Sequence, residues 1–218
     1  MRIVTVALLA LLGSLFTGPV IAYESGDLLL RAGLLTSDPD AEGQELGNQD
    51  LEVADDTMPA FSVSYMVHEY VGLQFATSLP LTHNILLDDS SGAGSGNVGE
   101  TGVISPNATV QVHAPAFAGF HPWLGLGVHY SAFFEEDFRN QNARGIPADY
   151  QLELDSSTGL ITQLGVDMEV GDNWYVNGSV SQLRLETTAT VTDSNGFVGE
   201  EDIDLDPLQW QIGVAYRF

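Results

Sequence analysis

Apolar and polar residues alternate along the C-terminal stretch 208–218. A period of two is the period of a β-strand, so the two kinds of residue lie on opposite sides. Bulky aromatic residues stand at the end of the stretch, as they do in the interfacial girdle of a membrane barrel. The pattern predicts the closing strand of a transmembrane β-barrel, with lipid on the side that carries Leu208, Trp210, Ile212, Val214, Tyr216 and Phe218.

The same alternation predicts seven earlier strands, at about 28–34, 60–67, 71–80, 107–113, 123–133, 159–170 and 174–188. The connections are alternately short and long, and the long ones are polar: 36–57, 88–102, 135–150 and 192–204. The predicted fold class is therefore all-β, an eight-stranded antiparallel transmembrane β-barrel with both termini periplasmic and four long extracellular loops. A soluble up-and-down barrel is the alternative, but it would place the aromatic side chains inside.

The N-terminus has the form of a secretory signal peptide. Met1-Arg2 is a short positive region, residues 3–12 are apolar, and small or modest side chains at 20–22 suit a cleavage site. The apolar run is short for a membrane helix. The predicted organisation is a cleaved signal peptide, 1–22, followed by one barrel domain, 23–218, in the bacterial outer membrane.

The composition is strongly acidic, with 30 Asp and Glu residues against 6 Arg and no Lys. Such a surface argues against nucleic acid as a partner. The acidity suits either a saline habitat or divalent cations that bridge the loops to anionic membrane lipid and lipopolysaccharide. The chain has no Cys, which excludes disulfides and thiolate metal sites. No cofactor and no metal site are predicted.

Alternation also predicts which side chains line the lumen. Five of them could form a slot for a small hydrophobic ligand or could simply pack the interior: Leu29, Met66, His129, Phe133 and Ile161. An eight-stranded barrel is nearly filled by its own side chains, so a wide aqueous pore is not expected.

Four charged residues are expected to point into the lumen. An unpaired charge there is costly, so Arg31, Asp167, Glu169 and Arg217 should form an ion-pair network. Such a network would plug the route to the periplasm and favour a lateral exit. Pro80 and Pro106 cannot donate to a strand ladder, and they mark the expected lateral opening.

Catalysis is the alternative from a different functional class. His129 and Ser131 lie on the same side of one strand, and this pair resembles the His-x-Ser of barrel lipid A deacylases. Nucleophilic catalysis would also need an orienting acid and an oxyanion hole. Because His129 should face the lumen rather than lipid, no catalytic residue is predicted. A structural or surface-interaction barrel with a closed lumen is the third interpretation.

The ordered motifs along the chain resemble the OmpW family of small outer-membrane barrels, which includes the AlkL proteins. The matching positions are Arg31-Ala32-Gly33, Tyr65-Met66, 80–83, 122–125, Tyr130, Phe133-Phe134, 165–167, Trp174, Val176-Asn177, 187–189, 205–207 and Tyr216-Arg217-Phe218. The resemblance implies a narrow, partly apolar lumen that admits small hydrophobic molecules and releases them sideways into the bilayer. It also implies that Tyr216 and Phe218 form the signal by which the barrel-assembly machinery recognises the chain.

Overall fold

The structure, a computed structural model, is described for residues 23–38, 45–46, 49–53, 56–88, 96–138, 151–194, 196–204 and 206–218. The predicted signal peptide, 1–22, lies outside these residues. Within them, no helix is long and apolar enough to cross a membrane.

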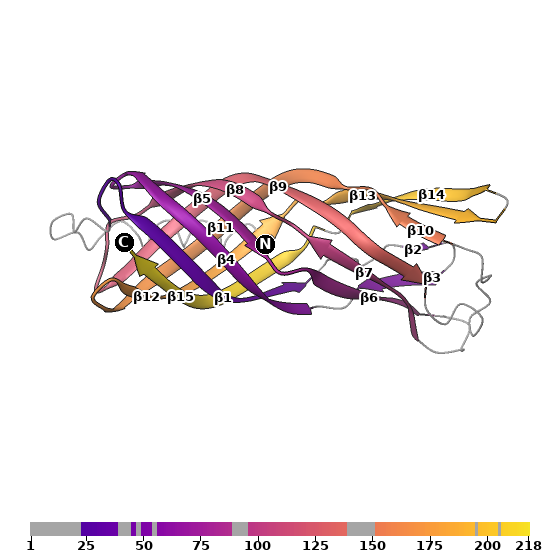
Figure 1. The fold of residues 1–218 in the computed structure, drawn as a ribbon, viewed down its shortest axis with the longest axis horizontal. Helices are drawn as coiled ribbons and strands as arrows, with labels where there is room; N and C mark the ends of the chain where they lie inside the picture. The colour runs from indigo at the N-terminus through magenta and orange to yellow at the C-terminus, as the bar shows by residue number, and fades with distance from the viewer. Residues whose placement is uncertain are drawn as a thin grey trace, which may run out of the picture.

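Eight antiparallel strands close into a barrel, which confirms the predicted fold class (Figure 1). The ring closes because one long strand, β9, pairs with β8 on one side and with β11 on the other. In spatial order the strands are β1 (Leu28–Asp38), β4 (Asp56–His68), β5 (Val71–Ser78), β8 (Asn107–His113), β9 (Phe120–Phe138), β11 (Ser157–Gly171), β12 (Trp174–Leu183) and β15 (Leu208–Arg217).

The strand register sets the tilt of the barrel. Following paired residues once around the wall from Leu28 leads back to β1 at Asp38, ten residues farther along the strand (38 against 28). The path passes Tyr65, Leu73, Val110, Leu126, Thr162, Gln182 and Leu208. Strands with such a stagger are steeply inclined, at roughly 45° to the axis. Each residue therefore climbs only about 2.3 Å along the membrane normal, given a rise of about 3.3 Å per residue.

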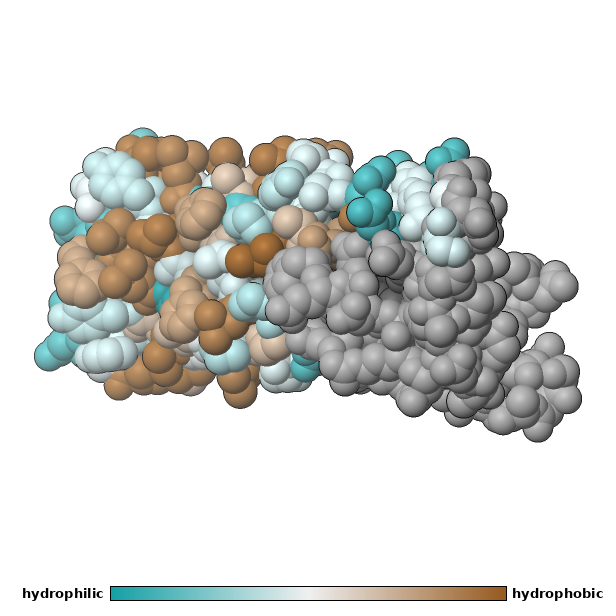
Figure 2. Space-filling model, turned by 45° about the vertical axis from the view of Figure 1, so that its right-hand side comes forward, coloured by the Kyte–Doolittle hydropathy of each residue, from teal (hydrophilic) through white to brown (hydrophobic). Residues whose placement is uncertain are grey.

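Side chains alternate between the lumen and the outer surface along these strands. On β15, Trp210, Ile212 and Val214 are exposed while Gln209 and Ala215 are buried, as the sequence predicts. Figure 2 shows apolar side chains spread over the outside of the barrel. This surface is the side that faces lipid.

The last residue closes the wall through both backbone and side chain. Phe218 exchanges backbone hydrogen bonds with Leu28, at 2.9 and 3.4 Å, and its ring packs edge-on against Tyr216. Tyr216 in turn contacts Trp174. Together these rings form an aromatic group at the periplasmic end of the barrel.

Deleting Phe218 is expected to reduce the amount of assembled barrel severalfold, because the chain loses both its terminal aromatic ring and the closing bonds to Leu28. Heat-modifiable electrophoretic mobility of the membrane fraction measures the folded yield. Phe218→Tyr is the matched control, since it keeps the ring and the backbone and should assemble normally. A deletion variant that assembled as well as this control would contradict the assembly role.

The predicted loops contain more strand than the sequence analysis expected. The wall continues above the membrane as β2 (Glu45–Leu46), β3 (Gln49–Val53), β6 (Leu81–Asp88), β7 (Gly96–Ile104), β10 (Gln151–Leu154), β13 (Glu186–Asp193) and β14 (Gly196–Asp204). Figure 1 shows these strands extending from one end of the barrel. Hairpins in water need paired backbones but no apolar side. Their acidic and Gly-rich sequences therefore show no alternation of apolar and polar residues and resemble loops.

The strand predicted at 174–188 is in fact two strands. β12 ends at Leu183 and β13 begins at Glu186. The partner strand is interrupted at the same level, where Asp206 has a φ of 21° and Pro207 follows it. Because proline has no backbone N–H, the ladder cannot run through this point.

Candidate functional site

A bidentate ion pair between Arg31 and Asp167 crosses the lower lumen. Arg31 donates from Nε to Oδ1 at 3.1 Å and from Nη2 to Oδ2 at 2.7 Å. The two side chains are 1% and 0% exposed. Such a fork is the strongest geometry for an arginine and a carboxylate, and both charges are removed from water.

The pair is held by further hydrogen bonds. Asn177 donates to Asp167 at 2.6 Å, Tyr23 donates its hydroxyl at 3.0 Å, and Arg31 donates to Ser64 at 2.6 Å. The Tyr23 hydroxyl therefore acts as a donor to the buried carboxylate. Every oxygen of Asp167 is therefore satisfied, as a buried carboxylate requires.

Below the ion pair the lumen is closed by an aromatic and apolar group. Tyr23, Leu29, Met66, Tyr175 and Ala215 form one buried cluster. The Tyr23 ring also packs against two histidines, with centroids 5.1 Å from His113 and 5.3 Å from His121. We call this cluster, with the two histidines and the ion pair, the plug. It leaves the periplasmic end of the barrel filled by side chains.

The sequence analysis missed Tyr23, Asn177 and both histidines as members of the plug. Tyr23 precedes the first strand, so alternation says nothing about its position. His113 and His121 continue the inward rows of β8 and β9, and that alternation could have assigned them to the lumen.

The predicted four-residue charge network is wrong. The Glu169 side chain is 53% exposed and lies 3.8 Å from His121. Arg217 lies 3.8 Å from Asp27 and donates to Asn173 at 3.1 Å. Both residues stand at the periplasmic rim, below the level where the wall encloses the lumen. Of the four predicted residues, Arg31 and Asp167 are the two that pair inside it.

The five predicted slot residues do not form one slot. Leu29 and Met66 belong to the plug, whereas His129 and Ile161 are buried higher in the lumen. Phe133 lies higher still, where β9 pairs with Val103 of β7. They separate because alternation gives the side of a strand that a residue occupies but not its height in the barrel.

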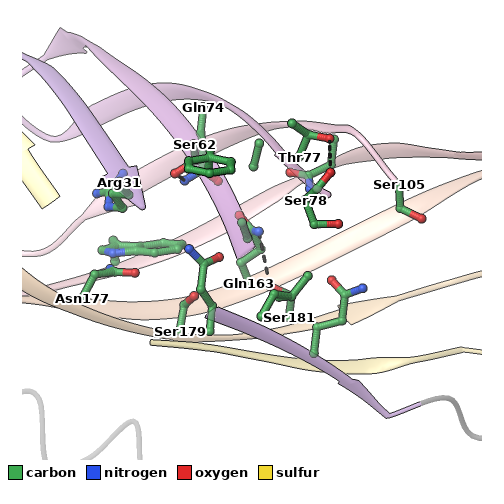
Figure 3. A pocket seen from close by; sticks show the side chains of 18 residues that line it. Arg31, Ser62, Gln74, Thr77, Ser78, Ser105, Gln163, Asn177, Ser179 and Ser181 are labelled. Atoms are coloured by element: carbon green, nitrogen blue, oxygen red, sulfur yellow. Dashed lines mark hydrogen bonds between the residues drawn. The ribbon is translucent and has the colours of Figure 1, made fainter. Parts of the chain in front are cut away.

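Between these levels lies a polar cavity of about 30 Å³ (Figure 3). It has room for about two water molecules. Gln163 donates to Ser181, and Thr109 donates toward both Gln74 and Gln163. Figure 3 shows Gln74, Gln163 and Ser181 on different strands around this cavity. The lining is mostly amide and hydroxyl groups: Ser62, Gln74, Thr77, Ser78, Ser105, Asn107, Gln163, Asn177, Ser179, Ser181, Gln209 and Gln211.

An apolar layer lies above the polar one. Ile161 precedes Gln163 on the descending strand β11, and Leu183 follows Ser181 on the ascending strand β12. The two apolar residues are paired neighbours on adjacent strands and point into the lumen side by side. Both are at most 1% exposed. Leu35 and Ala60 line the upper part of the cavity beside this layer.

The barrel wall is interrupted next to the apolar layer. The β5–β8 ladder ends at Ala76 and Asn107, and the β6–β7 ladder begins at Leu81 and Val103. In the described structure, no backbone hydrogen bond joins 77–80 to 104–106. Pro80 and Pro106 both lie in this stretch. Neither residue has a backbone N–H, so neither can donate a hydrogen bond to a ladder here. We call this stretch the wall break.

The wall break lies in the outer half of the membrane. Residues 77–80 stand six to nine positions above Val71, where β5 begins at the periplasmic turn. That separation corresponds to about 14–21 Å along the membrane normal, in an apolar band of about 25 Å. Thr77, Ser78, Ser105 and Asn107 also line the polar cavity, so the cavity reaches the break.

His129 and Ser131 are hydrogen-bonded but do not form an accessible catalytic pair. His129 Nδ1 lies 3.0 Å from the Ser131 hydroxyl, and Nε2 lies 2.8 Å from the backbone oxygen of Arg184. A carbonyl therefore occupies the position of the orienting acid, and both side chains are at most 1% exposed. No group of three His, Asp or Glu side chains in the described part of the chain could hold a metal ion.

Comparison with known proteins gives a consistent result. The family model described as "OmpW family" matches residues 24–218. Outer membrane protein W of Vibrio cholerae serotype O1 is 30% identical over 217 residues, which covers 98% of this chain and 99% of that protein. The crystal structure of the outer membrane protein OprG from Pseudomonas aeruginosa matches with a TM-score of 0.77 at 25% identity, covering 91% of this chain and 99% of OprG.

The structure of the outer membrane protein AlkL in lipid bilayers shares the fold, with a TM-score of 0.67 at 21% identity over 94% of this chain and 96% of AlkL. The relatives are outer-membrane proteins, in agreement with the apolar outer surface of this barrel. The chain therefore belongs to the OmpW family of bacterial outer-membrane barrels.

Proposed function

We propose that this protein admits small hydrophobic molecules from the extracellular side and releases them sideways into the outer leaflet through the wall break. The observation that carries the proposal is the position of the break, beside an apolar layer and above a closed plug. A molecule that enters from outside would pass a mixed lining, in which Val103 and Leu185 are apolar and His129 and Ser131 are polar, before it reaches the apolar layer. The nearest way out from that layer would lead into lipid.

The plug argues against a straight route to the periplasm. Moving Arg31 or Asp167 aside would leave the other charge buried and unpaired, which costs several kcal/mol. The polar layer above the ion pair adds a second barrier, because an apolar ligand there would strip amides such as Gln163 of their hydrogen bonds.

The wall break offers a less costly exit. Elsewhere, separating two strands would sacrifice backbone hydrogen bonds worth about 0.5–1.5 kcal/mol each. Between 77–80 and 104–106 there are none to lose among the described residues. The cavity of about 30 Å³ is too small for an organic ligand, so passage requires these segments to move apart.

The second candidate is a structural or surface-interaction barrel whose lumen stays closed. The small size of the cavity favours it. The two functions differ in one measurable respect, which is the uptake of an apolar compound with and without the protein.

A removable cross-link over the wall break tests the proposal. Ser78→Cys and Ser105→Cys introduce the only two thiols, since the natural chain has no cysteine. Bridging them by oxidation or with a short thiol-specific cross-linker should lower naphthalene uptake by cells to that of cells lacking the protein. Cleaving a reducible bridge should restore uptake.

The matched control bridges a seam that is already paired. Ser181→Cys with Gln209→Cys joins β12 to β15 at residues in direct register, and uptake should not change. Unchanged uptake after bridging the wall break would refute that exit. Equal uptake with and without the unmodified protein would refute transport and support the closed barrel.

A further inference from the structure

Arg184 stands at the extracellular edge of the lipid-facing surface. It continues the outward row of β12, which runs through Gly178, Val180 and Gln182. It lies ten positions after Trp174, which belongs to the periplasmic aromatic group (184 against 174). This separation is about 23 Å along the membrane normal, close to the full height of the apolar band. The guanidinium is therefore at the level of the outer headgroups.

The Arg184 guanidinium is largely free to bind another group. Its side chain is 74% exposed, and its nearest acid, Asp206, lies 3.8 Å away. An exposed pair at this distance contributes little. Asp206 faces Arg184 through Oδ2, while its Oδ1 accepts the backbone N–H of Leu185 at 3.0 Å. Of the basic residues in the described ranges, Arg31 is buried and Arg217 is at the periplasmic rim, so Arg184 is the basic residue on this edge.

An apolar groove of about 700 Å³ lies lower on the same outer side of the barrel, displaced sideways from Arg184 because the strands are inclined. Its floor is Gly178, which has no side chain, and an added Cβ there would meet nothing within 4 Å. Its edges are exposed side chains of the neighbouring strands, Leu164 on one side and Trp210 and Ile212 on the other. From Gly178 to Arg184 the distance along the normal is about 14 Å.

We propose that Arg184 and this groove form a binding site for the phosphorylated glycolipid of the outer leaflet. The guanidinium would hold a phosphate of the headgroup by a two-pronged hydrogen bond, and an acyl chain would lie over Gly178. The vertical offset matches this arrangement, since the charge is at headgroup height and the groove lies within the hydrocarbon.

The net charge of the chain argues against a free anion as the ligand. With a formal net charge of −24, the protein as a whole repels anions, so a free anion would not be drawn to an exposed arginine. Burial of an acyl chain supplies the missing affinity, at about 0.8 kcal/mol per methylene group. The site therefore requires both parts of an amphipathic ligand.

Native mass spectrometry of the refolded barrel with bisphosphorylated, hexa-acylated lipid A tests the site. Arg184→Gln should weaken lipid A binding about tenfold or more, because a charge-assisted hydrogen-bonded pair is lost. Arg184→Lys should recover part of the affinity, and Arg217→Gln at the opposite rim should have none of this effect. Heat-modifiable mobility would confirm that each variant is folded.

The groove is tested separately. Gly178→Phe fills it without an internal clash and should weaken lipid A binding severalfold, whereas Ala108→Phe on the exposed surface of β8 should not. Wild-type affinity in Arg184→Gln would overturn the phosphate assignment, and wild-type affinity in Gly178→Phe would overturn the acyl site. Equal binding of phosphatidylglycerol, or full competition by inorganic phosphate, would overturn the glycolipid as the ligand. None of these measurements depends on uptake of a hydrophobic compound.

Discussion

Replacing Arg31 with alanine is expected to lower the free energy of unfolding by about 3–5 kcal/mol, the usual cost of removing one partner of a buried ion pair. The variant leaves the Asp167 carboxylate fully buried, with Asn177 and Tyr23 as its only remaining donors among the described contacts. Urea titration of the barrel in phospholipid vesicles, followed by tryptophan fluorescence, measures the change.

Two comparisons make this expectation specific. Arg217→Gln removes a partly exposed arginine whose carboxylate partner lies 3.8 Å away, and it should change the free energy of unfolding by about 1 kcal/mol or less. The double variant Arg31→Ala with Asp167→Ala should cost less than the sum of the two single variants, by about 0.5–3 kcal/mol. A loss below about 1 kcal/mol for Arg31→Ala would show that the pair does not hold the plug together.

Gly165→Ala is expected to destabilise the barrel by about 1–3 kcal/mol, the typical cost of overpacking a filled interior. The new methyl group would overlap the indole of Trp123. That indole is only 3% exposed and lies 5.6 Å from the Arg31 guanidinium, so it has little room to retreat. The same urea titration measures the loss.

Gly178→Ala is the matched control for this prediction. The two glycines lie on neighbouring strands, but Gly178 faces lipid and an added Cβ would meet no atom within 4 Å. Its replacement should therefore be close to neutral or slightly stabilising, because alanine restricts the unfolded chain. Equal losses at both positions would show that the Trp123 ring can move aside.

Alternation along the chain was enough to predict the barrel and the sides of its strands. It worked because each spanning strand has one side in lipid and one in a narrow lumen, so the hydrophobic pattern has a period of two. Trp210 and Gln209 are adjacent in sequence and lie on opposite sides as expected. The extracellular hairpins were not predicted because their outer side faces water. Their two sides therefore do not differ in hydrophobicity as those of the spanning strands do.

The heights of the lumen residues could not be predicted in the same way. Arg31 and Asp167 are 136 residues apart and meet because of a stagger that accumulates over the whole ring of strands. Glu169 is only two residues from Asp167, yet it lies at the rim. Tyr23 precedes every strand, and its entry into the lumen depends on the tertiary structure alone. Register is a property of pairs of strands, so a pattern within one strand does not contain it.

The long strand β9 connects the membrane barrel to the extracellular strands. Among the described strands it alone pairs in both tiers, with β8 and β11 in the membrane and with β7 above it. Its lower end carries His121, which belongs to the plug and packs against Tyr23, and Trp123, whose ring lies 5.6 Å from the Arg31 guanidinium. Its upper end pairs with 104–106, the segment on one side of the wall break. One continuous strand therefore joins the extracellular sheet, the edge of the wall break and the plug.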